Sequence, residues 1–167
     1  ALRDVVRADS DAILKKLPMD YLLSGWPELY RAHGVTNGGG DTISYIETQG
    51  ATGICVECGQ HNDPNGAQVG YDSILITLNH LGIIQATLPP QKPGKHLRFF
   101  HMTRAKEGDT FVKIWKGFDK LAKGELIGTR ADGGEVRAPR DCYIVFPFPN
   151  AEVGAEWFYL AEELPLF

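Results

Sequence analysis

The chain has 167 residues, 43% of them hydrophobic and 23% charged, with a net charge of −4, which is typical of a soluble globular protein of one ordinary domain or two small ones. This acidic balance gives no electrostatic case for binding nucleic acid or an anionic membrane, and no apolar run approaches the roughly 20 residues that span a bilayer. An odd number of cysteines and an N-terminus without a signal-peptide core predict a reducing, cytoplasmic location and no disulfide framework.

The N-terminal quarter carries helical patterns and a glycine-rich loop. A helix is predicted over 3–17, which Pro18 ends, and a second short helix over 22–30. The loop over 35–42 contains three consecutive glycines but lacks the strand–turn–helix context of a phosphate-binding loop, so a flexible turn is the better interpretation. The amphipathic segment 43–47 fits either a helix or a strand.

The stretch 52–66 is the part of the sequence that most resembles an active site. Thr52–Cys58 predicts a short strand, Gly59 ends it, and a polar turn leads into a helix. A carboxylate near the C-terminal end of a buried strand, followed by a glycine and a loop with a histidine, is typical of an acid/base site on an open α/β sheet. Glu57 is therefore the candidate acid/base, and the alternative is that it is a solvated residue at the edge of a loop.

The two cysteines of this stretch invite a zinc or redox interpretation. Side chains alternate along a strand, so Cys55 shares one face with Glu57, while Cys58 shares the other with Ile54 and Val56. A metal knuckle needs both sulfurs on one side of a tight turn, and a thioredoxin-type pair sits directly at a helix N-terminus. Structural cysteines are favoured, and the alternative is a self-contained metal site that combines both with His61 and Asp63.

The clearest predicted element is a helix whose apolar residues follow helical spacing, at Ala67, Tyr71, Ile74, Leu75, Leu78 and Leu81, with Gly82 as its C-cap. The proline-rich segment 89–94 predicts a linker between domains 1–88 and 95–167. Beyond it the period changes to two, which predicts short strands over 96–103, 110–115, 125–129, 135–138 and 142–146, and an apolar tail over 157–161 that packs back on the body. Glycine-marked turns between these strands favour a small all-β barrel or sandwich.

Two motifs carry a resemblance to a known family. The first is Glu57-Cys-Gly-Gln-His61, after an apolar segment and before Asp63-Pro64. The second is GEVRAPRDCYIVFP over 134–147, followed by EWFYLA over 156–161. Their order and spacing, with the proline-rich segment between them, resemble the succinylglutamate desuccinylase/aspartoacylase family of zinc-dependent deacylases, which are related in fold to metallocarboxypeptidases. The resemblance covers the chain from about residue 40 onward.

The resemblance implies a fold and a mechanism. The fold would be α/β, a partial zinc-carboxypeptidase-like sheet with helices, followed by the small all-β domain. In such enzymes zinc polarises an amide carbonyl and activates water, and a glutamate is general base and then proton donor to the leaving amine. Glu57 matches that glutamate, and His61 is expected to contact the substrate or to support a residue that does. The implied substrate is a small N-acylated amino acid.

The chain also departs from the family pattern. The family's zinc ligands are a His-x-x-Glu pair and a later histidine, whereas the only histidine before Glu57 here is His33. The resemblance therefore implies the C-terminal portion of a longer enzyme, with zinc bound upstream, no metal ligand or cofactor in this chain, and no activity of the chain alone. Phe146 stands where some members have a substrate-contacting tyrosine, and no arginine shortly precedes Glu57, so the acyl group and the amine stay open.

The second part of the chain has another likeness. Residues 115–128, WKGFDKLAKGELIG, resemble the repeat of biotinyl/lipoyl-type barrel-sandwich folds. The comparable hairpin, 130–135, lacks the lysine that those carriers present, so we expect a barrel-sandwich-like architecture without a swinging arm.

The leading hypothesis is therefore a portion of a zinc-dependent amide hydrolase that supplies Glu57 and a cleft-shaping β-domain. The alternative is a non-catalytic binding or interaction module that uses the β-domain. A sheet left with an exposed edge also predicts self-association into a homo-oligomer.

Overall fold

The computed structural model describes residues 12–34, 42–51, 53–60, 62–90 and 94–166. Its contacts divide the chain into two compact units. The helical unit contains the described residues of 12–22 and 42–95, and the β unit contains 23–34 and 96–166. Most of the helix predicted over 3–17 lies outside the described residues. Of its described part, 12–17, only Ala12–Leu14 are helical.

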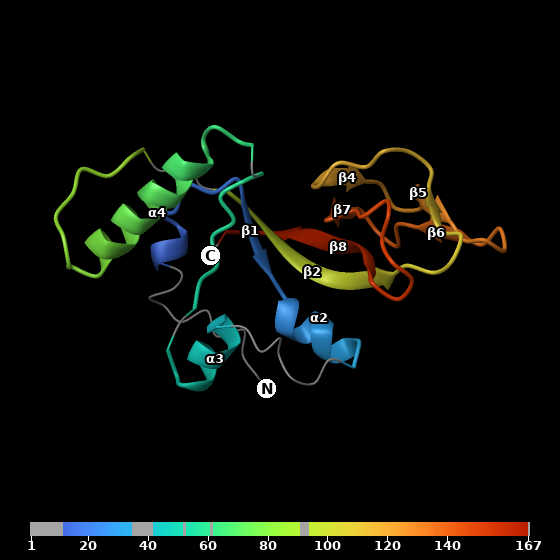
Figure 1. The fold of residues 1–167 in the computed structure, drawn as a ribbon, viewed down its shortest axis with the longest axis horizontal. Helices are drawn as coiled ribbons and strands as arrows, with labels where there is room; N and C mark the ends of the chain where they lie inside the picture. Colours follow the sequence, from blue (N-terminus) through green and yellow to red (C-terminus); the bar gives the residue numbers. More distant parts are fainter. Residues whose placement is uncertain (1–11, 35–41, 52, 61, 91–93, 167) are drawn as a thin grey trace. The chain divides into compact units, whose positions relative to one another are not determined.

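The helical unit contains α3 (Thr42–Thr48) and α4 (Gly66–His80) (Figure 1). The predicted helix 67–81 is thus confirmed to within a residue at each end. Gly82 follows it in the left-handed conformation, with φ +70° and its N–H bonded to the Asn79 carbonyl at 3.1 Å, as expected of a C-terminal glycine. The predicted apolar stripe faces solvent at Tyr71, Ile74 and Leu81, whose exposed fractions are 58%, 60% and 59%.

The second predicted helix was only half right. Residues 21–24 form the strand β1 (Tyr21–Ser24), and the helix α2 begins later and spans Trp26–Ala32. Gly25 separates them with φ +90°, a left-handed conformation that ends the strand and cannot continue a right-handed helix. Pro27 in the first turn then fits the helix start, where its missing N–H costs nothing.

The strands form two sheets. The larger has the order β1-β2-β8-β7-β4, with β2 (Lys95–Arg104), β8 (Glu156–Leu164), β7 (Cys142–Val145) and β4 (Asp119–Leu121) all pairing antiparallel. The smaller has the order β3-β5-β6, with β3 (Thr110–Phe111), β5 (Leu126–Thr129) and β6 (Glu135–Arg137). The strands predicted over 96–103, 125–129, 135–138 and 142–146 are confirmed with small shifts, and the whole is a mixed α/β arrangement.

The strand predicted over 110–115 stops after two residues. The paired residues of β3 end at Phe111, and the Val112 N–H makes one further backbone bond to the Ile127 carbonyl at 3.2 Å. Ile114 is 90% exposed, and the Trp115 indole N–H donates to the same Ile127 carbonyl at 2.9 Å. Val112, Lys113 and Ile114 are all exposed, so burial does not alternate along this segment as it would in a half-buried strand. A β-rich composition therefore did not suffice to extend the strand.

One hydrophobic core fills the β unit and joins the two sheets. Its fully buried members come from both, and the largest are Trp157 and Phe158 of β8, Ile127 of β5 and Ile144 of β7. The Trp157 ring stacks on Phe111 with centroids 4.6 Å apart and 19° between the planes. The apolar residues 157–161, predicted as a packed tail, are thus the centre of a nine-residue strand. Among the described helices, α4 included, none combines the length and the apolar character needed to cross a bilayer.

Candidate functional site

The segment that carries Glu57 is extended but is not a strand. The strand predicted over Thr52–Cys58 is wrong for the described residues 53–58, because extended backbone becomes a strand only when a neighbour pairs with it. The described strand pairings all involve other segments of the chain. The segment instead packs on helices, and a Cβ at Gly53 would lie 2.7 Å from Ile43 Cγ2 of α3.

The predicted alternation of side chains along this segment is confirmed. Cys55 and Glu57 are exposed, whereas Ile54, Val56 and Cys58 are half-buried. The Cys55 thiol donates toward Glu57 Oε1 at 3.6 Å, so the two exposed groups lie on one side. The Glu57 carboxylate therefore reaches solvent beside a thiol, which is compatible with proton transfer to and from a small molecule.

Cys58 holds the segment against the start of α4. Its Sγ lies 3.4 Å and its carbonyl oxygen 3.2 Å from the positions that Cβ atoms would take at Gly70 and Gly66. Glycine at these two helix positions therefore permits the close approach of the chain. Cys58 is a packing residue, as the sequence analysis favoured, and it faces away from Cys55.

A tight turn connects Glu57 to α4. Gly59 has φ +108°, and a Cβ there would lie 2.9 Å from Asp63 Oδ2. Asp63 Oδ1 accepts the Asn65 N–H at 2.8 Å, and the Asp63 N–H donates to the Gln60 carbonyl at 2.9 Å. These bonds hold the turn between Glu57 and the first residue of α4 in one conformation. His61, the predicted substrate contact, lies outside the described residues.

The described residues do not make a metal site by themselves. No three described His, Cys, Asp or Glu side chains lie together as ligands of one ion would. Of the alternative site, Cys55 and Cys58 face apart and Asp63 is engaged in the turn, while His61 is not among the described residues.

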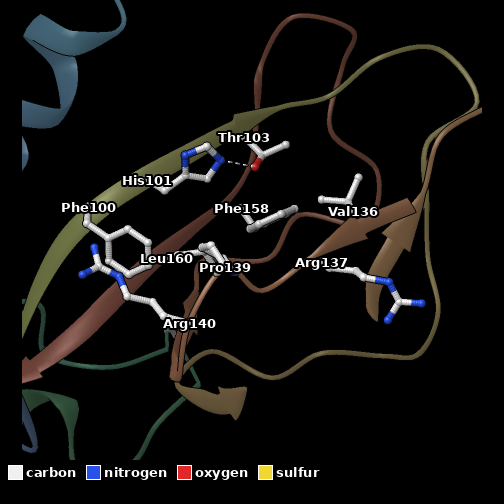
Figure 2. Close-up of a pocket in the computed structure, with 9 residues that line it drawn as sticks. All are labelled: Phe100, His101, Thr103, Val136, Arg137, Pro139, Arg140, Phe158 and Leu160. Carbon is white, nitrogen blue, oxygen red and sulfur yellow. Dashed lines mark hydrogen bonds between the residues drawn. The ribbon is translucent and has the colours of Figure 1, made fainter. Parts of the chain in front are cut away.

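The β unit holds a concavity that the sequence analysis missed. It has a volume of about 430 Å³, and we call it the β cleft (Figure 2). One wall comes from β2, the base from β8, and the other wall from β6 and the turn after it. The lining residues are Phe100, His101, Thr103, Val136, Arg137, Pro139, Arg140, Phe158 and Leu160. These residues lie in three segments far apart in the sequence, so no local pattern could have indicated the cleft.

The fold of the chain is that of the deacylases whose motifs it resembles. Structures of the succinylglutamate desuccinylase/aspartoacylase family match it over nearly its whole length, and the predicted resemblance is confirmed at the level of the fold. Neither a protein-family model nor a curated protein sequence matches the chain.

Three solved structures illustrate the likeness. Succinylglutamate desuccinylase from Vibrio parahaemolyticus has a TM-score of 0.62 and 19% identity, over 95% of this chain and 45% of that one. The ectoine utilization protein EutE (DoeB) from Ruegeria pomeroyi, in a product-bound structure, has a TM-score of 0.67 and 16% identity, over 92% and 48%. A succinylglutamate desuccinylase/aspartoacylase from Rhodobacter sphaeroides has 0.66 and 15%, over 96% and 52%. The chain spans about half the length of these structures.

Proposed function

We propose that this chain is a portion of a zinc-dependent amide hydrolase that acts on small N-acylated amino acids, and that it supplies the general acid/base Glu57 and a β-domain that shapes the substrate cleft. Two findings together support the proposal: the fold is similar to that of succinylglutamate desuccinylase/aspartoacylase structures over 95% and 96% of this chain, and the motif Glu57–His61 resembles the glutamate-bearing motif of that family. A cytoplasmic location and a barrel-sandwich-like β-domain belong to the same proposal.

The position of Glu57 supports its role. A general base must reach the proton it abstracts, and the Glu57 side chain is exposed at the end of an extended segment that a glycine turn and α4 hold in place. Glu57 would take a proton from the attacking water and give one to the leaving amine. This proton transfer is the catalytic role that we propose for Glu57.

The surface of α4 supports the proposal that this chain is one part of a larger domain. Tyr71, Ile74 and Leu81 are more than half exposed along one helix, and Ile83 after it is 64% exposed. Large exposed apolar groups at helical spacing are typical of a surface that another polypeptide segment covers.

The test is the substitution Glu57→Gln in the protein that carries the zinc ligands. It keeps the size of the side chain and removes its base, so we expect kcat for hydrolysis of N-acetyl and N-succinyl amino acids to fall by at least ~10²-fold, with little change in KM. Glu107→Gln, another exposed carboxylate, is the matched control and should keep full activity. An unchanged rate in Glu57→Gln would refute the assignment.

Zinc content, measured by elemental analysis on this chain alone, distinguishes the proposal from a local metal site. Less than about a tenth of an equivalent is expected if the ligands lie elsewhere. A full equivalent that disappears in Cys55→Ser would instead establish the alternative site of Cys55, Cys58, His61 and Asp63.

A second candidate function is a binding module that uses the β-domain. The specific observation in its favour is the β cleft, which is lined only by residues of the β unit.

A further inference from the structure

The β cleft has the size and the base of a small-molecule site. Its volume of about 430 Å³ lies within the roughly 300–1,000 Å³ of known ligand pockets. Phe158 and Leu160 lie beneath its base in the hydrophobic core, with exposed fractions of 0% and 1%, so the apolar surface that a ligand would touch comes from Phe100, Val136 and Pro139. Phe100 and Val136 pack against the same core from the two walls. A ligand that fits must therefore present an apolar body, and the aromatic lining favours a ring.

One cation lies at the edge of this apolar surface. The Arg140 guanidinium stacks over the Phe100 ring with Cζ 3.8 Å from the ring centroid, and its Nη1 donates to Glu162 Oε2 at 2.8 Å. The side chain is still 50% exposed. A guanidinium has five N–H donors in a fixed plane, so one ion pair leaves donors for a second carboxylate.

The second arginine of the cleft is engaged elsewhere. Arg137 donates to Glu135 Oε2 and to the Gly124 carbonyl, both at 2.7 Å. Figure 2 shows its guanidinium directed away from the other lining residues, whereas Arg140 lies against Phe100. Arg140 is therefore the cation that an anionic group in the cleft would meet.

The opposite wall offers hydrogen bonds without charge. His101 Nε2 lies 3.2 Å from Thr103 Oγ1. Burial, together with the nearby His33 ring, lowers the pKa of His101 below 6.5, so the imidazole is neutral at neutral pH. The cleft thus combines an apolar base, a neutral polar wall and one guanidinium, that of Arg140, which lies against the lining, whereas the equally exposed Arg137 is directed away from it.

We propose that the β cleft binds a small aromatic carboxylate, with its ring between Phe100, Val136 and Pro139 and its carboxylate on Arg140. This site is built from β-unit residues alone, so it does not depend on the hydrolase role proposed for Glu57. It gives the β-domain a ligand-binding role of its own.

The experiment is an NMR titration of the chain with phenylacetate, phenylacetamide and phenethylamine, which share a ring and differ in charge. Phenylacetate should cause saturable shifts at the amides of the cleft residues, with Kd on the order of 1 mM. Phenylacetamide should bind several-fold more weakly, and phenethylamine should not bind. Shifts that do not saturate, shifts that map outside the cleft, or equal binding of the amine would each overturn the proposal.

Two substitutions separate the cleft from general charge effects. Arg140→Gln should weaken phenylacetate binding about tenfold, because a charge-assisted hydrogen bond is lost. Lys113→Gln is the matched control: Lys113 also stacks on a ring, Trp115 at 3.9 Å, and pairs with a glutamate, Glu125 at 3.4 Å, but it does not line the cleft. Equal affinities of Arg140→Gln and the unmodified chain would refute the role of Arg140. If Arg140→Gln does not fold, the ligand series on the unmodified chain decides the proposal.

Discussion

The close packing around Gly128 predicts the effect of adding a single methyl group. Gly128 of β5 is buried, and a Cβ there would lie 2.6 Å from the Thr110 carbonyl oxygen and 2.6 Å from Trp157 Cη2. Favourable carbon contacts begin near 3.5 Å, so Gly128→Ala creates two overlaps of about 1 Å each. Neither neighbour can yield easily, because Thr110 belongs to the β3–β5 ladder and the Trp157 ring, 1% exposed, is stacked on Phe111.

We expect Gly128→Ala to lower the free energy of unfolding by about 2 kcal/mol, within the range that overpacked cores show. For a unit of this size this corresponds to a fall in Tm of roughly 10 °C. Thermal unfolding followed by tryptophan fluorescence measures it, since the loss of Trp157 packing reports on the β unit. Gly117→Ala is the control, because among the described residues nothing lies within 4 Å of the Cβ position there. A Tm of Gly128→Ala within about 2 °C of the control would refute the packing argument.

Two further predictions follow from the ionisable groups. Burial raises the pKa of the Cys142 thiol to about 11, so in the native protein Cys142 should resist a thiol reagent at pH 8 that labels the exposed Cys55. Mass spectrometry of the labelled peptides measures the extent of labelling at each cysteine, and equal labelling of the two would contradict the prediction. The lowered pKa of His101 means that the unfolded chain binds its proton more readily below pH 6.5, so the free energy of unfolding should fall as the pH decreases from there through the folded-state pKa. His101→Gln should flatten this part of the pH dependence in urea unfolding, and an NMR titration that gives His101 a pKa at or above 6.5 would contradict the reasoning.

The β unit was predictable because its strands are marked locally. Leu126–Thr129 and Cys142–Val145 are short apolar or β-branched runs, and turns close both of them. The strand β4 was missed because nothing local defines Asp119–Leu121; it exists through its pairing with β7, where Asp119 lies opposite Ile144. The β cleft was beyond prediction for the same reason, since its walls meet only through the two sheets.

Around Glu57 the local pattern predicted the side chains but not the secondary structure. Alternation placed Glu57 and Cys55 on one face and Ile54, Val56 and Cys58 on the other; the structure agrees, and it shows that the face of Glu57 and Cys55 is the exposed one. The same alternation was taken as evidence for a strand, but a period of two describes any extended backbone, whereas a strand also requires a partner. His61 lies outside the described residues, and its role stays a prediction.

The structure changes the physical reason for the position of Glu57. The sequence predicted a carboxylate carried by the end of a strand in an open sheet, where neighbouring strands would fix its place. In the structure, the segment is fixed by α3 against Gly53, by α4 against Cys58, and by the turn around Asp63. All of these contacts lie within the helical unit, and in the contact with α4 a Cβ at Gly66 would lie only 3.2 Å from the Cys58 carbonyl oxygen. The placement of the proposed acid/base therefore depends on the close approach of Cys58 to Gly66, and a larger residue at Gly66 should move the Glu57 carboxylate while leaving the β unit intact.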